Sequence, residues 1–168
     1  MQVKVLLISN DEIVNKTAPQ ILNFSQTKIL IHDRYDNVPD VMNKFKPNLV
    51  VINHKPPDFD YASMIPVVRE IDEDVTILIM SEIDDTDTVV NSIKAGAVDF
   101  IDRSTKPESA RLRIKAILEN VRMKKRLAML DAKEKNVSAN IIGECPQVNE
   151  IKQMIKKIVQ AATTTILI

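Results

Sequence analysis

Apolar residues gather in five short runs along the chain, and each run is followed by a segment with the spacing of a helix. The runs are almost wholly apolar and do not alternate with polar residues, which is typical of strands buried on both faces of a sheet. Strands that alternate with helices favour a parallel sheet covered on both sides. We therefore expect an α/β fold with a five-stranded parallel sheet, and the predicted strands are residues 3–9, 27–33, 48–53, 75–81 and 98–102.

The segments between the predicted strands repeat apolar residues every three or four positions, as amphipathic helices do. Each repeat predicts a helix with one face turned toward the sheet. A helix is therefore expected to connect each strand to the next along the chain. The four expected faces are Ile13, Thr17, Ile21 and Leu22; Val38, Val41, Met42 and Phe45; Met64, Val67, Val68 and Ile71; and Thr86, Val89, Val90, Ile93 and Lys94.

A fifth and longer helix is predicted from Pro107, a favoured residue of the first helical turn, to about Asn136. It carries two apolar stripes on roughly opposite faces. The first stripe is suited to packing on the sheet and contains Ala110, Ile114, Ile117 and Val121. The second stripe, called the seam below, contains Leu112, Ala116, Met123, Leu127 and Leu130. The spacing of the seam favours contact with the same helix of a second copy, and the alternative is that the helix lies on its own chain.

The chain continues past this helix into the start of a second module. Its last residues, TTTILI, form a β-branched run with the character of a strand. A single strand of this kind needs neighbours to be buried, so we expect the sequence to be part of a longer protein. The expected organisation is a first domain at residues 1–121, a helical linker at 122–136 that continues the fifth helix, and a fragment of a second domain at 137–168.

Composition excludes several classes of function. The chain has 23 basic and 23 acidic residues, so no net charge favours nucleic acid or an anionic membrane. The single cysteine, Cys145, cannot form an internal disulfide, and no window reaches the ~18 apolar residues of a membrane span, so we expect a cytoplasmic protein. Only Gly96 and Gly143 are present, whereas phosphate-binding loops need several glycines close together. We therefore do not expect this chain to be an enzyme.

The motifs KVLLISND, KPNLVVINHKPPDFD, ILIMSE and KAGAVDFIDRS make residues 1 to about 121 similar to the receiver domain of bacterial response regulators. The stretch IIGECPQVNEIKQMI, followed by TTTILI, resembles the opening of the AAA+ ATPase domain of NtrC-type, sigma-54-dependent transcriptional activators. The first resemblance implies a flavodoxin-like (βα)5 receiver fold. The second implies that a Walker A loop follows this sequence, so ATP is expected only in the full-length protein.

The resemblance also implies a phosphorylation pocket, and here the residues depart from the family's pattern. Receivers end their first strand with two acidic residues that hold Mg²⁺, and the matching residues are Ser9 and Asn10, with Asp11 next along. The aspartate that accepts phosphate corresponds to Asn53. An amide is far too weak a nucleophile to form an acyl phosphate, and Mg²⁺ is held by carboxylates at such sites. We therefore expect neither phosphorylation at Asn53 nor a metal site.

Three further positions correspond to the switch residues of a receiver. The lysine that pairs with the phosphoryl group corresponds to Arg103, the hydroxyl residue after the fourth strand is kept as Ser81, and the aromatic switch position is Phe100. Without clustered carboxylates the pocket also lacks their mutual repulsion. We expect Arg103 to pair with Asp11 or Asp102 and to hold the pocket in one state.

These features favour a regulatory module of a sigma-54-dependent transcription regulator in two-component signalling. The spacing of the seam favours a homodimer through the fifth helix and the linker. The resemblance implies that the module controls its own AAA+ domain, with sigma-54 RNA polymerase and DNA contacted only through absent domains. Two alternatives stay open. One is a receiver phosphorylated at another acceptor, such as Asp11. The other is a small flavodoxin-like enzyme, although Ser9, Asn53 and Ser81 have no evident activating base in the sequence.

Overall fold

The computed structural model describes residues 2–34, 36–54, 61–82, 86–139, 149–151 and 153–154. The chain divides into two compact units, Met1–Arg122 and Met123–Ile168. The first unit contains the whole sheet and every candidate residue of the pocket. Most of the expected second module at 137–168 lies outside the described residues, including its predicted final strand, so the AAA+ interpretation stays a prediction.

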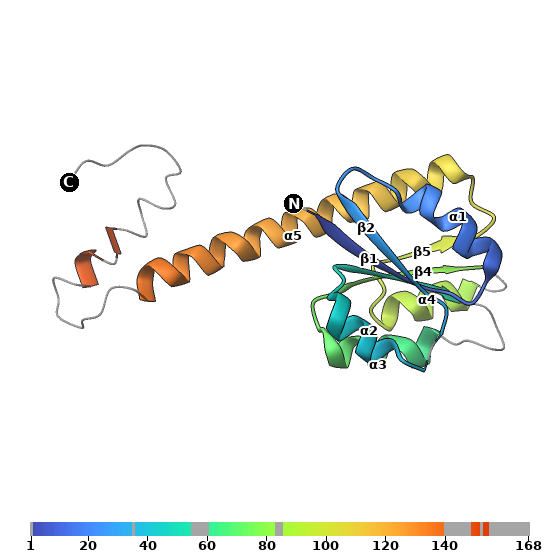
Figure 1. The fold of residues 1–168 in the computed structure, drawn as a ribbon, viewed down its shortest axis with the longest axis horizontal. Coiled ribbons are helices and arrows are strands. Elements are labelled where there is room, and N and C mark those ends of the chain that lie inside the picture. Colours follow the sequence, from blue (N-terminus) through green and yellow to red (C-terminus); the bar gives the residue numbers. More distant parts are fainter. Residues whose placement is uncertain are drawn as a thin grey trace. The chain divides into compact units, whose positions relative to one another are not determined.

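Five parallel strands form one sheet in the order β2-β1-β3-β4-β5 (Figure 1). Their bounds are β1 Val3–Ile8, β2 Thr27–His32, β3 Leu49–His54, β4 Thr76–Ser81 and β5 Asp99–Asp102. All five predicted strands are confirmed, with ends shifted by no more than one residue. The chain runs from β1 outward to β2 and then returns to β3 on the other side of β1, so the direction of winding reverses between β1 and β3. In sheets of this kind, sites form where the winding reverses.

Helices cover both faces of the sheet. Figure 1 shows α1 (Glu12–Leu22) and the start of α5 (Pro107–Ala139) on one face, and α2 (Val38–Phe45), α3 (Tyr61–Ile71) and α4 (Thr86–Lys94) on the other. Two apolar cores result, one on each face. Leu7 and Val51 of the central strands point into the α1/α5 core, and Leu6 and Val50 point into the α2/α3 core. Consecutive strand residues therefore face opposite cores, which explains why the runs are apolar throughout.

Two of the expected helix faces are partly wrong. In α1, the residues that face the sheet are Val14, Ala18 and Leu22, whereas Ile13 is 69% exposed. Asp11 caps the helix through Ile13 and Val14, and Val14, rather than Ile13, lies in the α1/α5 core. In α4, Val89 is half-buried but Val90 and Ile93 are exposed, and the fully buried residue is Ser92, whose hydroxyl donates to the carbonyl of Val89. The faces of α2 and α3 are as predicted.

The long fifth helix is confirmed, and its 33 residues extend slightly beyond the predicted end. The first stripe is buried as expected, with Ala110, Ile114, Ile117 and Val121 in the α1/α5 core. The seam residues Leu112, Ala116, Met123, Leu127 and Leu130 are all exposed. Although α5 is long, neither it nor any other helix in the described part of the chain is apolar enough to cross a membrane.

Candidate functional site

The carboxyl ends of β1 and β3 bring Ser9 and Asn53 together, although 44 residues separate them in the sequence. Both residues are fully buried. The Nδ2 of Asn53 donates a hydrogen bond of 3.0 Å to Oγ of Ser9. Because this contact lies where the winding of the sheet reverses, it occupies the usual place for a site in a parallel α/β fold.

Asp11 lies two residues after Ser9 and is the N-cap of helix α1. Its Oδ1 accepts hydrogen bonds from the backbone N–H groups of Ile13, at 2.9 Å, and Val14, at 3.2 Å. Its own N–H donates to Oγ of Ser9, at 3.2 Å. Asn15 in the first turn of the helix donates from Nδ2 to the backbone oxygen of Ser9, at 3.0 Å. Ser9 therefore fixes the start of α1 through both its side chain and its backbone.

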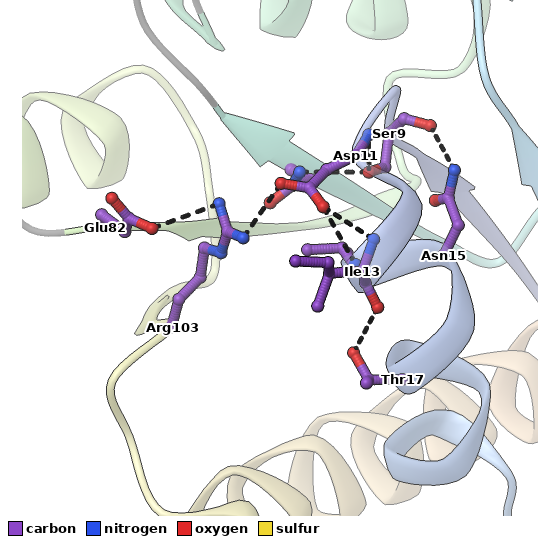
Figure 2. A network of polar contacts seen from close by, with 9 residues as sticks. Ser9, Asp11, Ile13, Asn15, Thr17, Glu82 and Arg103 are labelled. Atoms are coloured by element: carbon purple, nitrogen blue, oxygen red, sulfur yellow. Dashed lines mark hydrogen bonds and ion pairs between the residues drawn. The ribbon is translucent and has the colours of Figure 1, made fainter.

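Arg103 reaches Asp11 from the opposite side of the pocket (Figure 2). Its guanidinium donates to Oδ2 of Asp11 at 3.0 Å and lies 3.5 Å from Oε1 of Glu82. Its backbone N–H donates to the oxygen of Ser81. The predicted ion pair is thus present with Asp11, whereas the side chain of Asp102 accepts hydrogen bonds from Ser104. Arg103 connects the segments that follow β1, β4 and β5.

The environment of Asp11 favours its ionised form. Burial opposes ionisation and raises the pKa. The hydrogen bonds from Val14 and Ile13 and the charge and hydrogen bond of Arg103 together outweigh burial, so the pKa of the Asp11 carboxyl is lowered below its ordinary value of 3.8. Asp11 is therefore an anion that is already paired at neutral pH.

The side-chain oxygens of Asn53 and Asn15, two residues bonded to Ser9, are buried and have no hydrogen-bond partner among the described residues. Rotating the amide of Asn53 by half a turn exchanges its two atoms but does not remove the defect, because Ser9 Oγ is the hydrogen-bond partner of this side chain in either orientation. A buried polar atom that lacks a hydrogen bond costs about 1–3 kcal/mol, which makes Oδ1 of Asn53 a position where substitution is informative.

The donor set at this position does not fit a hard divalent cation. Mg²⁺ prefers carboxylate and water oxygens, and Asp11 offers a carboxylate whose two oxygens already accept two N–H groups and a guanidinium. No group of three His, Cys, Asp or Glu side chains suited to a metal occurs in the part of the chain that the structure describes. A cation placed beside Asp11 would also face the positive charge of Arg103.

The remaining predicted site residues differ in their surroundings. Asn10 is exposed, whereas Ser81 is buried and its hydroxyl donates to the backbone oxygen of Glu82 at 3.0 Å. Phe100 is buried in the α2/α3 core. Sequence reasoning missed Glu82 as a second partner of Arg103 and Asn15 as a partner of Ser9.

No protein-family model matches the sequence. Among curated proteins, the DNA-binding transcriptional regulator NtrC of Proteus hauseri is 21% identical over 132 residues, which cover 79% of this chain and 28% of that protein. The response regulator MprA of Mycobacterium bovis is 24% identical over 123 residues, which cover 73% of this chain and 53% of that protein. The chain therefore spans less than two thirds of the length of either relative.

Solved structures show the same fold. A CheY-like response regulator receiver domain protein from Methanospirillum hungatei has a TM-score of 0.64 at 18% identity, covering 74% of this chain and 99% of the other. NtrX from Brucella abortus, solved in complex with ADP, has a TM-score of 0.65 at 18% identity, covering 94% of this chain and 34% of the other. The fold is the flavodoxin-like fold of CheY-type receivers. The first unit therefore has the fold of response regulator receiver domains, and the sequence relatives, at 21% and 24% identity, are response regulators.

Proposed function

We propose that this receiver domain is a regulatory module that is not phosphorylated at the usual position and acts without bound Mg²⁺. The observation that carries the proposal is the arrangement around Asp11. Asn53 stands where a nucleophilic carboxylate is needed, and an amide cannot supply one. Arg103, the cation expected to form an ion pair with a phosphoryl group, is paired with Asp11 and Glu82 instead. Asp11 thus supplies, from within the protein, the negative charge that a phosphoryl group would otherwise bring to Arg103.

The proposed output is dimerisation through α5. The seam presents large apolar side chains to solvent, with Leu112 69% exposed and Leu127 61% exposed. Exposed apolar side chains at this spacing are typical of a helix that packs on a second helix. The first stripe of the same helix is already buried in the α1/α5 core. The seam therefore remains available for a second copy of the chain.

The proposed target is an attached AAA+ domain of a sigma-54-dependent regulator. The motif IIGECPQVNEIKQMI supports this, as does the similarity to NtrC of Proteus hauseri. The likeness to NtrX from Brucella abortus extends over 94% of this chain, beyond the receiver domain. In this proposal, contact with sigma-54 RNA polymerase and with DNA belongs to parts of the full-length protein outside this sequence.

The test combines intact-mass measurement with sedimentation. The chain is incubated with acetyl phosphate and Mg²⁺, and separately with beryllofluoride and Mg²⁺. The positive control is a receiver domain that keeps the phosphate-accepting aspartate and the acidic residues that hold Mg²⁺. The expected result is an unchanged mass and an unchanged sedimentation coefficient for this chain, with clear changes for the control. The Asp11→Asn variant is included because Asp11 is the alternative acceptor.

Two outcomes would overturn the proposal. Uptake of a phosphoryl group by the parent chain but not by Asp11→Asn would establish Asp11 as a working acceptor. A beryllofluoride-dependent change in mass or assembly would show that a functional acidic pocket is present. A chain that is monomeric at all concentrations, with no response to either reagent, would retain the pocket assignment and remove the proposed dimer.

A further inference from the structure

Helix α1 is held by polar contacts at both of its ends, and both sets of contacts come from the segment that begins after β5. At the N-terminal end, Asp11 pairs with Arg103 at 3.0 Å while capping the helix. We call this contact the N-terminal clasp. It includes Ser9, which accepts a hydrogen bond from the N–H of Asp11, and through Ser9 it includes Asn53.

At the C-terminal end, α5 supplies the contacts. Arg111 donates to the backbone oxygens of Gln20, at 2.8 Å, and Asn23, at 3.3 Å, and its guanidinium lies 4.6 Å from the ring centre of Phe24. Arg122, three turns further along α5, donates to the backbone oxygen of Ser25. We call these contacts the C-terminal clasp.

The C-terminal clasp supplies a positive charge at the C-terminal end of α1. The last turn of α1 contains no basic residue, although a cation there complements the helix dipole and the free carbonyl groups. Arg111 provides that cation from another helix. Between the two clasps, Val14, Ala18 and Leu22 lie in the same apolar core as Ile114 and other residues of α5. Helix α1 is therefore attached to α5 along its length.

The pocket is also connected to α5 through strand β5. A separate contact, from Arg113, joins β5 to α5. Arg113 pairs with Asp99 and donates to the backbone oxygen of Phe100 at 2.8 Å. Phe100 is buried in the α2/α3 core, on the side of the sheet opposite to α5. This contact ties α5 to β5 without involving α1 or the pocket.

We propose that helix α1 transmits the state of the Ser9–Asp11–Asn53 pocket to α5 through the two clasps. A ligand or partner that separates Arg103 from Asp11 frees the first turn of α1. Because a helix is stiff, its last turn is bonded to Arg111, and the segment that follows it is bonded to Arg122 through Ser25, the displacement reaches α5 rather than stopping at the pocket. The inference rests on the proposed function only in treating the pocket as the point where a signal enters.

A double-mutant cycle tests this coupling. The substitutions Asp11→Asn and Arg111→Gln are made singly and together in the full chain, and the unfolding equilibrium constant of each is measured in urea. The two sites are separated by roughly 14 to 18 Å along α1, from 1.5 Å of rise per residue, and sites that far apart ordinarily act independently. Coupling predicts that the double variant departs from the product of the single effects by at least about threefold.

The matched control replaces Arg111→Gln by Arg113→Gln, which removes an arginine two positions away that does not contact α1 in any described contact. That cycle is expected to be multiplicative. Amide exchange gives a second readout, because Asp11→Asn is expected to accelerate exchange in α5 between residues 114 and 121 as well as in the first turn of α1.

The inference is overturned if both cycles are multiplicative, or if the faster exchange in Asp11→Asn stays within residues 11–15. Equal coupling in the Arg113 cycle would also overturn it, since the effect would then be general loosening of the domain. Neither result bears on phosphorylation, which the acetyl phosphate and beryllofluoride experiments decide separately.

Discussion

Arg103 donates to the carboxylate of Asp11 across a separation of 92 residues in the sequence, at a distance of 3.0 Å. The contact brings the segment after β5 onto the first turn of α1, where Asp11 also accepts two backbone N–H groups. One carboxylate therefore serves as a helix cap and as the partner of a cation. These two functions can be separated by substitution.

Substitutions at Asp11 are expected to be graded. Asp11→Ala removes a helix cap, at about 0.5–2 kcal/mol, and a charged hydrogen bond, at about 1.5–3 kcal/mol before solvent screening. Asp11→Asn keeps an oxygen for the cap but loses the charge and the hydrogen bond that Oδ2 accepts from Arg103, so it is expected to cost less than Asp11→Ala. Urea unfolding monitored by circular dichroism measures both. Lys16→Gln, at an exposed pair with Glu12, is the control and is expected to change stability by less than about 0.5 kcal/mol. Equal losses for the two Asp11 variants would contradict this assignment.

The stability of the domain is expected to depend on pH through Asp11. Its pKa is lower in the folded chain than in the unfolded chain, so the unfolded state takes up the proton first as pH falls. The contribution of Asp11 is present in full above its unfolded pKa and is lost as pH falls through the folded pKa. The difference in unfolding free energy between the parent and Asp11→Asn should therefore be constant from pH 7 to about 5 and shrink below about pH 4. A difference that widens on acidification would exclude this linkage.

Substitutions at Asn53 test its unsatisfied oxygen. Asn53→Val removes a hydrogen bond to Ser9 together with an oxygen that has no partner in the described part of the chain, so we expect a change within about 1 kcal/mol. Asn53→Asp places a carboxylate at a fully buried position and should cost about 1–3 kcal/mol at pH 7. Burial raises the pKa of such a carboxyl, so this cost should diminish as pH falls through the raised value. Thermal unfolding at pH 7 and pH 5 compares the variants, and a Val variant much less stable than the Asp variant would refute the assignment.

The seam is tested by placing a charge on it. Leu127→Lys is expected to leave the unfolding free energy of the first unit unchanged, because Leu127 is exposed. In a dimer the charge would be buried, and dissociation should become easier by at least about tenfold, or 1.4 kcal/mol. Sedimentation equilibrium measures this constant. Ile13→Lys, at an equally exposed apolar residue on α1, is the control, and a similar effect of both substitutions would argue against the seam.

The strands and their positions along the chain were predictable because each is an apolar run, and β1, β3 and β4 are buried on both faces. The phase of α1 was not, since its two candidate apolar faces differ by one residue. Periodicity alone cannot choose between Ile13 and Val14, and the fold buries Val14. The stripe of α5 that contains Ile114 was predictable because a buried stripe has to match the sheet.

The candidate site was predictable at Ser9, Asn53 and Arg103 only through resemblance. Taken one by one, a serine, an asparagine and an arginine form no motif that indicates a site. Charge predicted an aspartate partner for Arg103 but left Asp11 and Asp102 as alternatives, and the folded chain selects Asp11. The contact with Glu82 and the unsatisfied Oδ1 of Asn53 were not predictable, since both depend on distances between segments that only the folded chain defines. The arginines of α5 that hold α1 were missed for the same reason.

The amide of Asn53 has a consequence for the timing of a signal. An acyl phosphate on a carboxylate is a covalent intermediate that water can hydrolyse, so a phosphorylated switch carries its own lifetime. A switch governed by whether Arg103 lies on Asp11 contains no bond that decays. In the function proposed here, the duration of the response is therefore set outside the pocket, by how long a ligand or partner stays bound and by how much of the protein the cell contains.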